Sequence, residues 1–224
     1  QGCLLGMAAG AWLNAITREY SPSENAFSSL VWNIPFTWKP DDGIELALAL
    51  ANSLIKEKMF KPEAVYYAYL TWMLSRPFKE NRPILTGIGE KTSTLLRTAV
   101  LACFGRNCEL TQVIHWCALN VKITHPDPIC VFTNEIYAVA VFFALKSGTP
   151  EELYEKTIEW GFKSENQEKT VLEALLRAST SPPNAPYQGA ICSLQNAFYQ
   201  LLHAKPLTEG ILSCVEDTFP VDMA

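Results

Sequence analysis

Helix-favouring apolar residues recur along this chain on nearly every helical face, and this pattern most constrains the fold. Residues 41–57 place Leu and Ala on almost every side of the helix that a 3.6-residue period predicts. A helix that is apolar all round is stable when other elements cover it on every side. Residues 3–16 interleave Gly and Ala with larger apolar residues, which lets another backbone approach closely. Both segments are therefore predicted to be buried helices inside a larger helical assembly.

The chain is predicted to be all-α, a single compact multi-helix domain over residues 1–224. No segment shows a convincing alternation of apolar and polar residues, which would mark a strand, and no repeat or linker divides the chain. The pattern predicts helices over residues 3–16, 41–57, 62–74, 92–104, 111–122, 130–146, 168–178, 190–203 and 208–215, and another that Thr149 opens.

Charge and cysteine content exclude several classes of protein. The net charge of -5 argues against broad nucleic-acid binding, which depends on clustered Lys and Arg. The most apolar run, residues 137–145, is about half as long as the ~20 residues that span a membrane. The seven cysteines form no CxxC pair and fit reduced thiols. We therefore expect a cytoplasmic protein that binds neither nucleic acid nor membrane.

Four segments, in order along the chain, resemble motifs of the ADP-ribosylglycohydrolase family. Residues 2–13, GCLLGMAAGAWL, are similar to the family's opening helix, GxLxGxAxGDALG. Residues 40–50, PDDGIELALAL, resemble its [ST]DDTx[ML]xLAL segment, and residues 124–128, THPDP, resemble its THx[DN]P turn. Residues 189–215 also fit the family's late helices. The resemblance extends over nearly the whole chain and implies the family's all-α fold.

The resemblance implies an activity and a cofactor. Members of this family cleave the bond between ADP-ribose and a protein side chain or a small acceptor. They use two divalent ions, commonly Mg²⁺ or Mn²⁺, which suit the oxygen ligands of carboxylates and Thr hydroxyls. The ions polarise a water for attack at the anomeric carbon. The implied partner is ADP-ribose or an ADP-ribosylated protein, and a further protein partner is compatible with the resemblance.

Three carboxylates match the family's metal ligands. Asp41 and Asp42 match its first ligand pair, and Asp217 matches the first Asp of its GGDxDTN motif. Asp41 and Asp42 also stand where a helix begins, so they could equally satisfy free backbone amides and the helix dipole without any metal. The family continues with a further helix after the second motif, and we expect that the C-terminal helices are missing from this chain.

Other metal-binding positions of the family have lost their ligands. Pro40 and Gly43 stand where the family has hydroxyl side chains on either side of the Asp pair, and Ala11 replaces an Asp of the opening helix. Phe219 and Pro220 replace the second Asp and the Thr of the late motif. An apolar ring cannot ligate a hard cation, so a metal site would be a reduced one.

Three further residues match positions near the ligand. Glu19 lies one residue after the place of the family's catalytic Glu, which acts as general acid or base; the alternative is a solvated surface Glu. Arg97 is retained from the family's NG[SA]xMR loop, which approaches phosphate or ribose, although the Asn-Gly is lost. His125 belongs to the TH turn; it either lies near the ligand or bonds to nearby backbone.

Three functions remain open on the sequence. The chain is a hydrolase with a reduced metal site, a catalytically inactive relative that binds ADP-ribose or a protein, or a helical scaffold for protein contacts. Because fold does not fix function, the sequence leaves enzymatic activity undecided.

Overall fold

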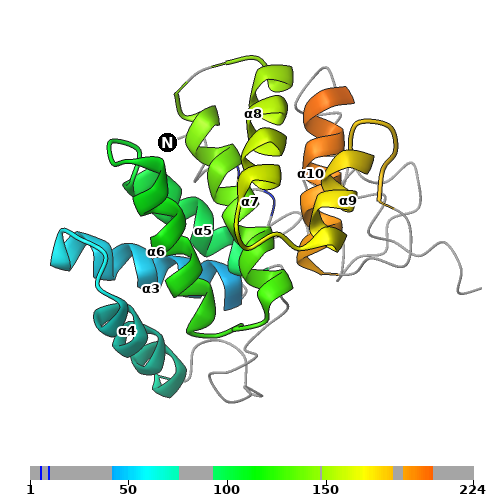
Figure 1. The fold of residues 1–224 in the computed structure, drawn as a ribbon. Coiled ribbons are helices and arrows are strands. Elements are labelled where there is room, and N and C mark those ends of the chain that lie inside the picture. The colour runs from blue at the N-terminus through cyan, green and yellow to red at the C-terminus, as the bar shows by residue number, and fades with distance from the viewer. Residues whose placement is uncertain are drawn as a thin grey trace, which may run out of the picture.

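The computed structural model describes Gly6, Gly10 and residues 42–75, 93–146, 148–183 and 189–203. Over these residues all regular secondary structure is helical, which confirms the all-α prediction (Figure 1). Eight helices lie here: α3 (Asp42–Glu57), α4 (Pro62–Leu74), α5 (Ser93–Phe104), α6 (Leu110–Lys122), α7 (Pro128–Ala144), α8 (Pro150–Lys163), α9 (Lys169–Arg177) and α10 (Ala190–His203). None of these eight combines the length and apolarity that crossing a bilayer requires.

Most predicted helix boundaries agree with the structure, and α7 differs for a local reason. The bounds of α4 and α10 match the prediction to the residue. We predicted α7 over residues 130–146, but it begins at Pro128, because a proline fits the first helical turn and Asp127 caps it. The Asp127 carboxylate accepts a hydrogen bond from the Ile129 amide at 3.2 Å. The helices predicted over residues 3–16 and 208–215 lie outside the described residues, apart from Gly6 and Gly10.

The helix at the centre of the described structure is α7. Helices α5 and α6 pack against it, and so do α8, α9 and α10 (Figure 1). Twelve of its 17 residues are buried. We predicted that residues 41–57 would form a buried helix, and this was wrong for one face of α3. Leu48 is 55% exposed and Ile55 is 73% exposed. Among the described helices, α4 and α5 pack against α3, and they leave this face of α3 open.

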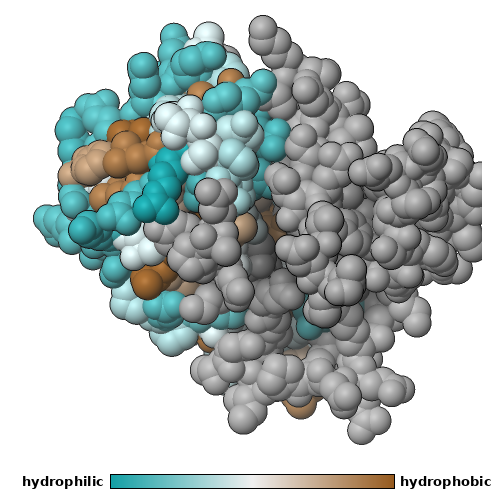
Figure 2. All heavy atoms as spheres, turned by 90° about the vertical axis from the view of Figure 1, so that its right-hand side faces the viewer, coloured by the Kyte–Doolittle hydropathy of each residue, from teal (hydrophilic) through white to brown (hydrophobic). Residues whose placement is uncertain are grey.

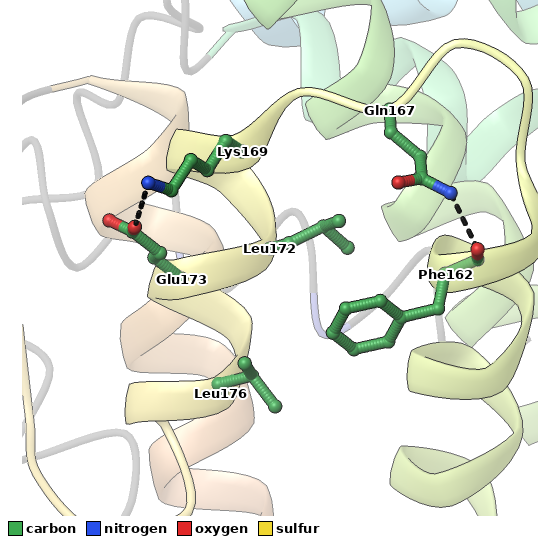
Figure 3. Close-up of a pocket in the computed structure, with 6 residues that line it drawn as sticks. All are labelled: Phe162, Gln167, Lys169, Leu172, Glu173 and Leu176. Atoms are coloured by element: carbon green, nitrogen blue, oxygen red, sulfur yellow. Dashed lines mark hydrogen bonds and ion pairs between the residues drawn. The ribbon is translucent and has the colours of Figure 1, made fainter.

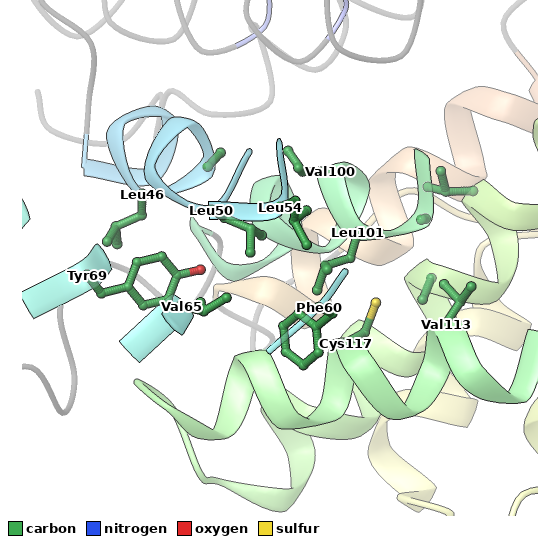
Figure 4. Packing of buried hydrophobic residues seen from close by; sticks show 14 of the residues in the cluster. Leu46, Leu50, Leu54, Phe60, Val65, Tyr69, Val100, Leu101, Val113 and Cys117 are labelled. Carbon is green, nitrogen blue, oxygen red and sulfur yellow. The ribbon is translucent and has the colours of Figure 1, made fainter. Parts of the chain in front are cut away.

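Two apolar clusters lie on either side of α7. In the first, Leu46, Leu50 and Leu54 of α3 meet side chains of α4, α5 and α6 (Figure 4). The second joins α7 to α8, α9 and α10 around residues such as Phe132. Tyr137 of α7 packs against both clusters. One helix therefore connects the two halves of the apolar core.

Two leucines on α3 offer a matched test of this packing. Leu50 is fully buried in the first cluster, whereas Leu48 is 55% exposed. Leu50→Ala should lower the free energy of unfolding by about 2–5 kcal/mol, because it leaves a cavity. Leu48→Ala should change it by no more than about 0.5 kcal/mol. Chemical denaturation of both variants measures the difference, and equal effects would contradict the orientation of α3.

Candidate functional site

Three polar side chains on α5 face the interior of the protein. Thr94, Arg97 and Thr98 lie three and four residues apart, so they share one face of the helix. All three are 0% exposed. Burying polar and charged groups is costly unless hydrogen bonds or charges compensate them. The partners of this face therefore decide how α5 sits against its neighbours.

Thr94 and Thr98 of α5 both hydrogen-bond to one asparagine of α7, Asn134. The Thr98 hydroxyl donates to Oδ1 of Asn134 at 2.8 Å. The amide nitrogen of Asn134 donates to Thr94 Oγ1 at 2.7 Å and to the carbonyl oxygen of Cys130 at 2.8 Å. Asn134 thus has partners for its oxygen and for both amide hydrogens, which fixes the register of α5 against α7.

Arg97 reaches the turn between α6 and α7. Its Nη2 donates to Oγ1 of Thr124 at 2.6 Å, and Nδ1 of His125 lies 2.9 Å from the same oxygen. The amides of Thr124 and His125 both donate to the carbonyl oxygen of Val121, at 3.0 and 2.8 Å. Thr124 is 1% and His125 7% exposed. The structure thereby brings together two residues, Arg97 and His125, that the sequence singled out separately.

The guanidinium of Arg97 also packs on an aromatic ring of α4. Its Cζ lies 5.2 Å from the ring centroid of Tyr69, whose hydroxyl donates to Oδ1 of Asn120 at 2.7 Å. Burial raises the pKa of Tyr69, and the charge of Arg97 opposes this in part. Among the described side chains, Arg97 Nε and Nη1 and Asn120 Nδ2 have no protein hydrogen-bond partner. A buried cation with polar neighbours therefore lies between α4, α5 and α6.

The acidic start of α3 joins this region through α4. Asp42 is half-buried at the first residue of α3. Glu45, one turn further, accepts a hydrogen bond from Trp72 Nε1 at 2.7 Å. Trp72 and Tyr69 are three residues apart on the buried face of α4. The contact of Glu45 is thus one helical turn along α4 from the contact of Arg97.

The described residues do not by themselves form a metal site. Glu19, Asp41 and Asp217 lie outside them, so Asp42 is the single predicted ligand that the structure places. In the described ranges no three His, Cys, Asp or Glu side chains are grouped to hold an ion. The nearby carboxylate of Glu45 is engaged with Trp72. A metal site would need donors from the rest of the chain.

Sequence reasoning missed several buried polar residues of this region. Tyr69, Asn120, Thr124 and Asn134 are at most 1% exposed, and each belongs to the hydrogen-bond network. One available signal was a polar residue inside an otherwise apolar helix, such as Asn134 in the sequence of α7. Thr124 belongs to the TH turn of the sequence, but its role as the shared partner of Arg97 and His125 depends on the tertiary fold.

Another carboxylate, Glu135, is buried on α7 at 3% exposure. Burial raises its pKa, and the charge of Lys122 and the side chain of Asn166 act in the opposite direction. Burial likewise raises the pKa of the Cys117 thiol on α6, and the charge of Glu135 adds to that effect. Glu135 is therefore a buried acidic group whose charged form is disfavoured by burial.

A shallow groove lies elsewhere, between α8 and α9, with a volume of about 430 Å³ (Figure 3). Figure 2 shows one face of the molecule, on which apolar residues gather in a patch that hydrophilic residues border. The groove is lined by Phe162, Gln167, Lys169, Leu172, Glu173 and Leu176. No described residue that the sequence singled out for chemistry borders it, so we do not assign the site there.

The hydrogen bond between Tyr69 and Asn120 can be tested with a matched pair on α4. Tyr69→Phe removes the hydroxyl and leaves the Asn120 side chain buried without that donor, which should cost about 1–3 kcal/mol of unfolding free energy. Tyr67 is 64% exposed, so Tyr67→Phe should change stability by less than about 0.5 kcal/mol. Urea titrations compare the two, and similar values would argue against the buried bond.

Glu135 predicts a pH dependence of stability. Its folded pKa is raised above the ordinary value of 4.5, so its contribution to stability is fully present below that pH and is lost as pH rises through the folded pKa. Glu135→Gln should therefore be more stable than the parent at neutral pH, and its stability should fall less than that of the parent as pH rises. Melting temperatures between about pH 4 and pH 8 measure it. Glu155→Gln, at an exposed position of α8, is the control; parallel curves for parent and Glu135→Gln would contradict the prediction.

Comparisons with known proteins agree with this fold. A solved structure described as an "ADP-ribosylglycohydrolase-related protein complex" superposes with a TM-score of 0.72, over 96% of this chain and 78% of that one, at 18% sequence identity. At that identity the likeness establishes the fold alone. A comparison with curated proteins finds no match. A sequence model of ADP-ribosylglycohydrolases matches residues 1–218, a range that includes every predicted site residue. The chain therefore belongs to the ADP-ribosylglycohydrolase family.

Proposed function

We propose that this chain binds ADP-ribose, free or attached to a protein, and that the turn containing His125 contributes to the binding. The observation that carries the proposal is the hydrogen-bonded arrangement of Arg97, Thr124 and His125. The motif resemblance implies a place near the ligand for two of these three residues, Arg97 and His125. Buried partners hold the turn in place, and a turn that is already ordered loses little entropy when a ligand binds.

Binding without turnover agrees with the residues at the family's metal positions. Pro40 and Gly43 supply no hydroxyl on either side of the Asp pair, and Phe219 and Pro220 supply no ligand in the late motif. Mg²⁺ and Mn²⁺ need several oxygen donors. We therefore propose that ADP-ribose binds without metal. We also propose that the chain forms a single cytoplasmic domain over residues 1–224.

Metal-dependent hydrolysis of the ADP-ribose–acceptor bond is the second candidate. It would use Asp41, Asp42 and Asp217 as ligands and Glu19 in proton transfer. Support comes from Asp42, which is half-buried at the start of α3 with the buried Glu45 one turn away. Two carboxylates on one end of a helix are a setting that a cation would stabilise.

Calorimetric titration of Mg²⁺, Mn²⁺ and ADP-ribose separates these functions. The variant is Asp41→Ala/Asp42→Ala. Its control is Glu151→Ala/Glu152→Ala, which removes another adjacent acidic pair from the first turn of a helix, at exposed positions of α8. We expect ADP-ribose to bind the parent and both variants alike without added metal, and we expect His125→Ala to weaken this binding by about tenfold or more, which is about 1.4 kcal/mol.

The other outcomes are equally definite. ADP-ribose binding that requires metal and disappears only in Asp41→Ala/Asp42→Ala would overturn metal-free binding, and it would favour the hydrolase, which an assay for release of ADP-ribose would then test. The absence of ADP-ribose binding with and without metal would rule out both candidates and leave a helical scaffold.

A further inference from the structure

The guanidinium of Arg97 carries a positive charge that no described carboxylate neutralises. Its Nη2 donates to Thr124 Oγ1 at 2.6 Å, and its Cζ lies 5.2 Å from the ring centroid of Tyr69. These contacts are favourable, but both partners are neutral. The ion pairs between described residues join side chains near the surface, and Arg97 takes part in none of them. A guanidinium stays protonated in proteins, so a full positive charge is buried here.

Hydrogen-bond donors without acceptors lie beside this charge. Nε and Nη1 of Arg97 are buried and have no partner among the described residues, and the same is true of Nδ2 of Asn120. Oδ1 of Asn120 accepts from the Tyr69 hydroxyl at 2.7 Å, which leaves Nδ2 as the free end of the amide. These nitrogens can only donate. Because buried donors without acceptors are costly, such groups in native proteins commonly bind an ion or water.

Arg97 and Asn120 are brought together by two shared contacts. Both contact Tyr69 of α4. Arg97 also donates to Thr124, which follows Asn120 by four residues, and residues four apart lie on the same side of a helical segment. The Thr124 amide donates to the carbonyl oxygen of Val121 at 3.0 Å, which continues the turn beyond the end of α6. The donors without acceptors therefore lie where α4, α5 and α6 meet.

The chemistry of this place selects its ligand. A buried cation surrounded by donors is stabilised by an anion, which compensates the charge and accepts the hydrogen bonds. Arg97 and Asn120 are both 0% exposed, so the ligand must be small enough to be enclosed. A water molecule would accept hydrogen bonds but would leave the charge in place. A single monovalent ion the size of chloride meets both requirements.

We propose that Arg97 and Asn120 enclose one small monovalent anion, such as chloride, which completes the junction of α4, α5 and α6. The site goes beyond the proposed binding of ADP-ribose and does not depend on it. Because the ion binds the folded chain and not the unfolded one, it should stabilise the fold increasingly as its concentration exceeds the dissociation constant.

Thermal unfolding in sodium chloride and in sodium gluconate, at constant ionic strength, tests the proposal. Gluconate has the same charge as chloride but is too large for an enclosed site, and constant ionic strength removes the effect of screening. The melting temperature of the parent chain should rise by about 3 °C or more as chloride replaces gluconate. Bromide should act as chloride does.

A matched pair of variants separates binding at this site from a general effect of salt. Asn120→Asp keeps an acceptor for the Tyr69 hydroxyl and places a carboxylate beside Arg97, so its melting temperature should be the same in chloride and gluconate. Asn52→Asp makes the same change at an exposed position of α3 and should keep the chloride dependence of the parent.

Bromide also locates the site directly, even if Asn120→Asp does not fold. Anomalous diffraction from crystals of the parent chain in sodium bromide should show a peak beside Arg97 Nη1 and Asn120 Nδ2. Three results would overturn the proposal: equal melting temperatures of the parent in chloride and gluconate, a chloride effect that persists unchanged in Asn120→Asp, or bromide peaks at the protein surface only.

Discussion

The buried positive charge of Arg97 is the constraint on which the rest of the described site depends. A guanidinium with no exposure to water must be compensated by its neighbours. The ring of Tyr69 from α4 and the hydroxyl of Thr124 from the turn before α7 do this. Three segments that are distant in sequence are therefore held around one side chain, and the turn with His125 is among them.

The polar region and the apolar core stabilise each other. Leu46 and Tyr69 pack in the same apolar cluster, so the helix that carries the ring beneath Arg97 is held by its contacts with α3 (Figure 4). Asn134 of the central helix α7 hydrogen-bonds to Thr94 and Thr98 of α5. Apolar packing supplies the driving force for burial, and the buried hydrogen bonds select one register among several that apolar contacts alone would allow.

Much of the helical framework could be predicted from the sequence, because the apolar period and the caps are local signals. Thr149 accepts a hydrogen bond from the Glu152 amide at 3.2 Å, as expected for the start of α8. The exposure of Leu48 could not be predicted, since it depends on which helices pack against α3. The same holds for the burial of Arg97: its motif predicted a residue near the ligand, whereas its partners come from α4 and from the turn between α6 and α7.

The hydrogen bonds of Asn134 with Thr94 and Thr98 limit how these three positions can change in evolution. Replacing Asn134 removes the partner that Thr94 and Thr98 share, and replacing either threonine removes one of the partners of Asn134. A buried polar atom that loses its partner costs more than the bond itself contributed. Exchanging all three for apolar residues of similar shape would avoid that penalty, but no series of single steps reaches such a core without passing through a destabilised intermediate. The three positions should therefore vary together among relatives, and their covariation would mark the contact between α5 and α7 even where overall sequence similarity is low.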